Sequence, residues 1–129
     1  MDVEFFIEHD GSGRRFEPVV GACFEPDDAV LLWESRLTGV TVEELRRRGE
    51  PRTLAPMADG YLGFVFSARL CVALAAADQD RLDEVAEEWA EQEAGLGDPD
   101  AISARTAVEI LRGVAALARR RRWVYCRCW

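Results

Sequence analysis

Two cysteines near the end of the sequence have the spacing of a thiol pair. Cys126 and Cys128 are separated by one residue, so in a strand both thiols lie on the same face. Such a pair binds zinc or undergoes redox chemistry, and Cys23 and His9 are the residues that could complete a metal site. The C-x-x-C spacing of structural zinc sites is absent. We therefore expect no metal or cofactor, and we expect Val124, Cys126 and Cys128 to form the buried face of a terminal strand.

The composition excludes several kinds of catalysis. All 16 basic residues are arginine, and the single histidine is His9. A Schiff-base lysine, a phosphate-loop lysine and a metal site with two histidines from one chain are therefore excluded. No nucleophile-elbow, dinucleotide-binding or phosphate-loop motif occurs, so we assign no catalytic residue. Arginine in place of lysine, with abundant alanine and acidic residues, is typical of the codon bias of a high-GC bacterial genome.

Charge changes sign near residue 100. Residues 78–100 carry ten acids and one arginine, whereas residues 101–129 carry seven arginines and one acid. We expect two antiparallel helices here, whose opposite charges compensate each other. The run Arg119–Arg122 also suits the negative C-terminal end of a helix. Binding of an acidic protein or ligand is the alternative for this run, and the net charge of −8 argues against nucleic acid as a partner.

Two groups of residues are candidates for contact with a protein partner. The first is the acidic face of the predicted helix after residue 78, which would steer a partner by its charge. The second lies on the terminal strand, on the face opposite the cysteines, and has the residue types of binding hot spots. Their alternatives are a solvated helix face and a second buried layer. The acidic group is Asp83, Glu84, Glu87, Glu88 and Glu91, and the strand group is Trp123, Tyr125, Arg127 and Trp129.

Local signals predict strands at both ends of the chain and helices between them. Thr41 and Glu44 have the spacing of a capping box, in which the Thr41 hydroxyl accepts from the Glu44 amide and Glu44 reaches back to the cap amide. Asp98 and Pro99 are typical of a helix start. Residues 61–66 fit either a strand or the approach to a helix. We expect strands at 2–8, 15–20 and 123–129, helices from 26, 41, 67, 78 and 98, and a loop over 50–60.

These elements predict an α+β fold. Their order is not a regular alternation of strand and helix. We expect a single domain over residues 1–129, with a small mixed or antiparallel sheet formed by the N-terminal hairpin and the C-terminal strand. Four to five helices would cover this sheet.

The function predicted from the sequence is interaction with a protein. The N-terminus has no signal-peptide pattern, and the most apolar stretch is too short to span a bilayer, so we expect a cytoplasmic protein with reduced thiols and no membrane contact. In size, charge and architecture the chain resembles bacterial immunity and antitoxin proteins. We expect a non-enzymatic interaction module, of this kind or an accessory protein, that binds an unidentified protein or a second copy. The alternative is a small-ligand or metal-binding protein, possibly an enzyme, centred on Cys126 and Cys128.

Overall fold

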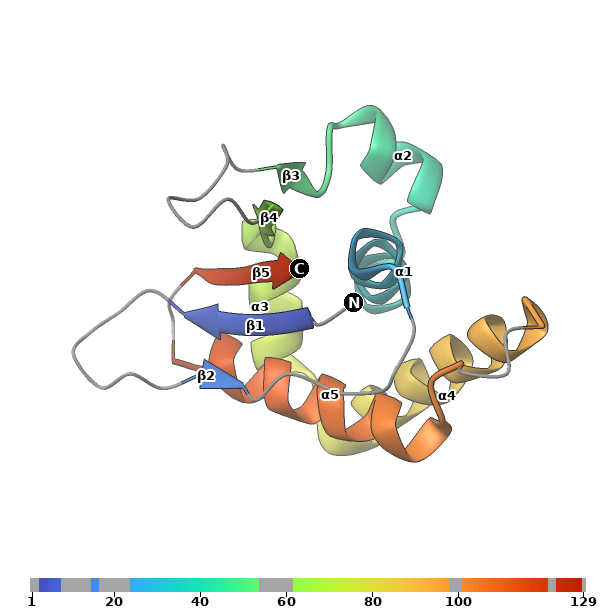
Figure 1. Ribbon diagram of the computed structural model, residues 1–129. Helices are drawn as coiled ribbons and strands as arrows, with labels where there is room; N and C mark the ends of the chain where they lie inside the picture. The colour runs from blue at the N-terminus through green and yellow to red at the C-terminus, as the bar shows by residue number, and fades with distance from the viewer. Residues whose placement is uncertain are drawn as a thin grey trace.

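The strands at the two ends of the described chain lie side by side. A computed structural model describes residues 3–7, 15–16, 24–53, 62–97, 101–120 and 123–128. Strand β1 (Val3–Ile7) pairs antiparallel with β5 (Val124–Cys128), so that Phe5 is opposite Cys126 (Figure 1). Because residues far apart in the sequence meet in one sheet while the helices lie between them, the predicted α+β class is confirmed.

The described strands form one antiparallel sheet in the order β2-β1-β5-β4-β3. Strand β2 (Arg15–Phe16) completes the predicted hairpin with β1, and β4 (Leu62–Val65) shows that the ambiguous segment 61–66 contains a strand. Strand β3 (Arg52–Thr53) pairs with β4 and corrects the predicted loop over 50–60. Two residues are too few to produce a recognisable alternation. Residues 8–14, which connect the two strands of the predicted hairpin, and residues 54–61 lie outside the described residues.

Five helices occur in the described part of the chain, and most of their ends follow local signals. Helix α1 ends at Gly39, whose φ of 80° suits glycine. Helices α3 and α4 start at the predicted positions 67 and 78, where the side chains of Ser67 and Asp78 cap them. None of these helices has the length and apolar content to cross a membrane. The helices are α1 (Pro26–Thr38), α2 (Val42–Arg47), α3 (Ala68–Ala76), α4 (Gln79–Gly95) and α5 (Ala104–Ala118).

The start of α5 differs from the prediction. We expect the helix to begin at Asp98–Pro99, but it begins at Ala104 with Ser103 as its N-cap. The Ser103 hydroxyl accepts a hydrogen bond from the Thr106 amide at 3.2 Å. The preceding Ile102 is buried outside the helix. Burial of this side chain in the connection competes with continuation of the helix towards residue 98.

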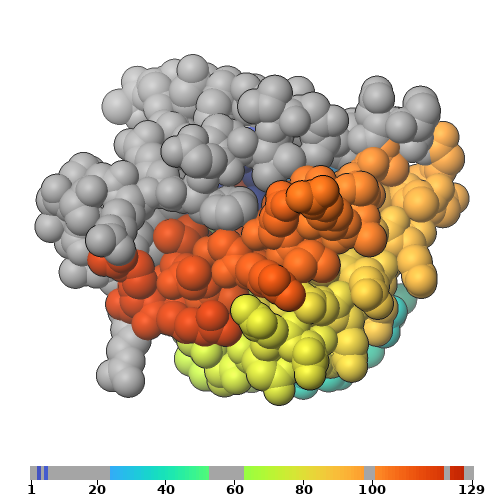
Figure 2. Space-filling view, turned by 90° about the horizontal axis from the view of Figure 1, so that it is seen from below, coloured from blue at the N-terminus to red at the C-terminus, as the bar shows by residue number. Residues whose placement is uncertain are grey.

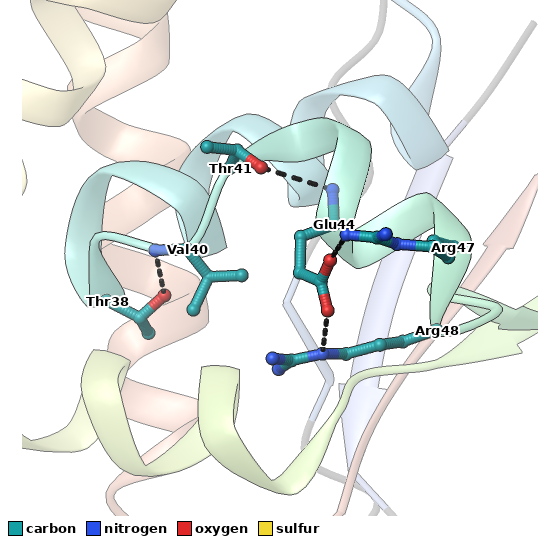
Figure 3. A network of polar contacts seen from close by, with 6 residues as sticks. All are labelled: Thr38, Val40, Thr41, Glu44, Arg47 and Arg48. Atoms are coloured by element: carbon teal, nitrogen blue, oxygen red, sulfur yellow. Dashed lines mark hydrogen bonds and ion pairs between the residues drawn. The ribbon is translucent and has the colours of Figure 1, made fainter.

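Only half of the predicted capping box forms at the start of the short helix α2. The Thr41 hydroxyl accepts from the Glu44 amide at 3.2 Å, which confirms the first half of the capping box. The second half is wrong, because the Glu44 carboxylate accepts hydrogen bonds from Arg47 and Arg48 instead (Figure 3). Two arginines within four residues offer this carboxylate charged donors, which are stronger than a neutral backbone amide.

Aromatic side chains join the sheet to the helices in the core. The Phe5 ring of β1 lies 5.8 Å from the Trp33 ring of α1, and Trp33 lies 5.0 Å from Trp89 of α4, measured between ring centroids. All three side chains are buried. In Figure 1, α3 crosses behind the sheet and α5 runs below it. The sheet and helices therefore share a core from which the exposed positions of β5 and α3 point away.

Candidate functional site

The described part of β5 alternates between the core and the surface. Val124 and Cys126 are fully buried, whereas Trp123, immediately before the strand, is 50% exposed and Tyr125 is half-buried. The predicted buried face is therefore confirmed at Val124 and Cys126. The side chains of Arg127 and Cys128, and all of Trp129, lie outside the described residues.

Cys126 packs in the core, and the other described thiol, Cys71, lies on α3; neither is in a disulfide. Burial raises the pKa of Cys71, a hydrogen bond with the backbone of Val124 lowers it, and the charge of Glu34 raises it. Within the described residues, no three or more His, Cys, Asp or Glu side chains are grouped so as to hold a metal. Cys23 and His9 lie outside those residues.

A hollow of about 580 Å³ separates α3 from Trp123. Val72 on its α3 side is 69% exposed, and Trp123 on the other side is the second large apolar side chain that reaches solvent here. Figure 2 shows the end of α5 and the start of β5 (red) beside α3 (yellow-green) on this face. We call this feature the α3 groove. Its lining residues are Ala68, Cys71, Val72, Ala75, Ala76, Ala118 and Trp123.

The α3 groove was not predicted from the sequence. Helix α3 has the sequence ARLCVALAA, in which Arg69 is the single charged residue. A helix that is apolar on all sides is normally buried on all sides. Leu70 and Leu74 of α3 are indeed buried, yet Val72 on the opposite side is exposed. Because one-sided burial depends on the packing of the other elements, no pattern in the sequence indicated that Val72 would be exposed.

Arginines lie at both ends of the α3 groove. Arg69 is exposed and follows the first lining residue, Ala68. At the other end, the Arg119 guanidinium donates to the carbonyl oxygens of Ala75 at 3.4 Å and Ala77 at 2.9 Å. These carbonyls belong to the last turn of α3, where a cation is favoured. The groove is therefore apolar along its length and positively charged at its ends.

The acidic residues of α4 are largely engaged within the molecule. Asp83 accepts two hydrogen bonds from Arg112 of α5, at 3.1 and 2.9 Å. Glu88 pairs with Arg36 of α1 at 2.8 Å. The predicted compensation of charge between α4 and α5 is thus present at the bidentate pair of Asp83 and Arg112. The hydrogen bond with Asp83 also raises the pKa of Arg112.

The remaining members of the predicted acidic group, Glu84, Glu87 and Glu91, are exposed to solvent. Glu84 is exposed and pairs with Arg81 at 2.9 Å on its own helix. Glu87 and Glu91 are exposed and take part in none of the ion pairs found among the described residues. These two carboxylates are the part of the predicted acidic face that remains available to an outside partner.

Glu34 is a buried acid that the sequence did not single out. It lies on the apolar side of α1 with 4% of its surface exposed. Burial raises its pKa above the ordinary value, and a hydrogen bond from Ser67 lowers it in part. The Ser67 hydroxyl donates to Glu34 and accepts from the Leu70 amide at 3.0 Å. The pair therefore ties α1 to the start of α3 and has the geometry of a structural cap.

Comparisons with known proteins do not indicate a function for this chain. The chain matches no protein family model, no curated protein and no solved structure. The features that bear on function are thus the exposed α3 groove, the free carboxylates of α4 and the buried thiol of Cys126.

Proposed function

We propose that this protein is a non-enzymatic protein-interaction module and that the α3 groove is its contact surface. The observation that carries the proposal is the exposure of Val72 and Trp123 on either side of an apolar hollow. Exposed apolar patches of this kind are costly in water and mark interaction sites. Tryptophan is also among the residues that contribute most to binding at interfaces.

We propose that the other predicted contact residues steer the partner or enlarge the contact surface. Glu87 and Glu91 provide a negative surface that steers a partner with a basic region. Asp83, Glu84 and Glu88 contribute less to steering, because arginines of this chain neutralise them. We propose that the contact surface continues beyond Trp123 to the other members of the strand group, Tyr125, Arg127 and Trp129.

The proposed role is that of an immunity- or antitoxin-like protein, or an accessory protein, in the cytoplasm of a bacterium. Cys71 and Cys126 are thiols rather than disulfides, which fits a reducing compartment. We do not extend the proposal to the alternative centred on Cys126 and Cys128, because the Cys126 side chain packs in the core.

Comparative affinity capture tests the proposal. Tagged wild type, Val72→Glu and Trp123→Ala would be used to capture proteins from the native cytoplasm. Leu96→Glu is the matched control, since Leu96 is 75% exposed and lies outside the α3 groove. All variants would first be shown by thermal unfolding to be folded at the temperature of the assay. For Val72→Glu and Leu96→Glu we expect the wild-type transition, because substitutions at exposed positions change stability by about 0.5 kcal/mol or less.

The expected result is at least one protein that wild type and Leu96→Glu retain and that Val72→Glu and Trp123→Ala lose. The proposal is wrong if every captured protein is retained equally by Val72→Glu and Leu96→Glu. It is equally wrong if nothing is retained above the level of the bare resin.

A further inference from the structure

The lining residues of the α3 groove follow one side of a helix. Ala68, Cys71, Ala75 and the neighbouring Val72 and Ala76 recur at separations of three and four residues. Such residues lie one above another along a helix. Because most of them are small, the backbone of a second helix can approach closely, and Trp123 with Ala118 provides a wall along one side.

The charged side chains around the α3 groove favour an occupant with negative charge. Arg69 lies at one end and the Arg119 guanidinium at the other. No aspartate or glutamate belongs to the lining residues. The nearest acid along the chain, Asp78, directs its carboxylate to the Arg81 amide at the start of α4. Two further acids lie nearby in space: Glu34 is buried and bonded to Ser67, and Glu50 lines an adjoining hollow with Ala68 and Trp123. The exposed charged side chains at the two ends of the groove are therefore arginines, although the whole chain carries a net charge of −8.

From this shape and charge we infer that the occupant of the α3 groove is an amphipathic helix of a partner protein, with large apolar side chains on one face and acidic side chains beside them. This inference rests on the proposed function and specifies its partner. Helices dock into grooves through apolar residues at i, i+3 or i+4, and i+7. The stripe from Ala68 to Ala76 spans about 12 Å at 1.5 Å per residue. The acids of the partner should therefore be about two turns apart, one near each arginine.

A second copy of this chain fits the groove less well. A twofold contact brings the same surface of each copy together. Antiparallel packing of two α3 helices would then place Arg69 of each copy near Arg119 of the other, and like charges in such proximity are unfavourable. Helix α4, the acidic element of the chain, presents carboxylates and glutamines on its exposed side and lacks the large apolar residues that would fill the groove.

A small molecule is also a poorer occupant. Small-ligand sites combine apolar walls with a few polar groups that orient the ligand. The groove has alanine, valine, cysteine and tryptophan in its lining, with no charged side chain among them. Its length and open apolar surface suit the face of a helix.

A peptide-display selection tests the inference. The library consists of helical peptides with leucine at i, i+3 or i+4, and i+7, and with glutamate, glutamine or lysine at each flanking position. Selection uses the full-length protein, with counter-selection against Val72→Glu. We expect glutamate to be enriched over lysine by a few-fold per position, the range of a single exposed ion pair. Selection on Arg69→Glu should reduce this preference or reverse it at the flanking positions near that residue, while Leu96→Glu should leave it unchanged.

Three outcomes of the selection overturn the inference: equal enrichment of glutamate and lysine, enrichment of lysine on the wild type, or no peptide that distinguishes wild type from Val72→Glu. Sedimentation of the wild type as a dimer that Val72→Glu converts to a monomer would also overturn it, in favour of a second copy. The proposed function fails separately, in the capture comparison. If Val72→Glu loses a protein in the capture comparison and the selection gives any of these outcomes, the proposed interaction module stands. Only the inference of an acidic helix as its occupant is then wrong.

Discussion

The Ser67 hydroxyl donates a hydrogen bond to the buried carboxylate of Glu34 while it caps the first turn of α3. Glu34 belongs to α1 and is 4% exposed. One polar contact thus fixes the start of the helix that forms the α3 groove. The surface that we propose for binding depends in this way on a buried acid in another helix.

Removal of the Ser67 hydroxyl should lower the free energy of unfolding by more than removal of an ordinary N-cap hydroxyl does. Ser103→Ala on α5 is the matched control, because Ser103 also caps a helix but lies exposed. We expect Ser103→Ala to lower the free energy of unfolding by about 1 kcal/mol. Ser67→Ala should lower it by a further amount of about 1–3 kcal/mol, because the buried Glu34 carboxylate loses its donor. Urea unfolding measures both, and equal losses in the two variants would contradict the account.

Glu34 should make stability fall as pH rises. Its pKa in the folded protein is raised by burial above the ordinary 4.5, so the folded state holds its proton more tightly than the unfolded state. The stabilisation is complete below the unfolded pKa and is lost as pH rises through the folded pKa. The free energy of unfolding of wild type minus that of Glu34→Gln should therefore decrease across this range. A difference that is constant with pH, or that increases, would show that Glu34 does not titrate as described.

The pair of Asp83 and Arg112 should couple α4 to α5. Its two hydrogen bonds, at 3.1 and 2.9 Å, join helices that no other described ion pair joins. A double-mutant cycle with Asp83→Asn and Arg112→Gln should give a favourable coupling that decreases as salt is added. A matched cycle on Arg105 and Glu109, which pair within α5 at 3.5 Å, should give a smaller coupling. Absence of coupling between Asp83 and Arg112 at low salt would refute their role as a link.

The Cys71 thiol should react slowly with alkylating reagents in the native protein. Burial raises its pKa, so less reactive thiolate is present near neutral pH. We expect its iodoacetamide reaction to be slower than that of a free cysteine and to accelerate with pH, with a peptide bound in the α3 groove giving further protection. Peptide mapping by mass spectrometry separates Cys71 from the other thiols. Cys126, which is fully buried, should react only when the protein unfolds.

Local signals in the sequence predicted much of the fold. The predicted helix starts at 67 and 78 depend on neighbours within a few residues, and both were confirmed by the caps Ser67 and Asp78. The start of α5 was wrong because Asp98–Pro99 and Ser103 are both acceptable helix starts. The position of Ile102 in the core favours the second start. Strand β3 exists through its pairing with β4, which no short segment reveals.

The candidate site was predictable only in part. Exposure of Trp123 and burial of Cys126 follow from alternation in a strand. Exposure of Val72 could not be predicted, since it depends on which neighbours cover α3. Packing of α1 and α5 against the Leu70 and Leu74 side leaves the opposite side uncovered.

Site-specific photo-crosslinking tests most directly whether the α3 groove contacts a protein. A photoreactive phenylalanine analogue would replace Val72 in the groove or, as the control, the equally exposed Leu96. Irradiation of the native cells should give a covalent adduct with one other protein from position 72 and none from position 96. Position 72 yielding no adduct, or the same adducts as position 96, would contradict the proposal that the groove is a contact surface.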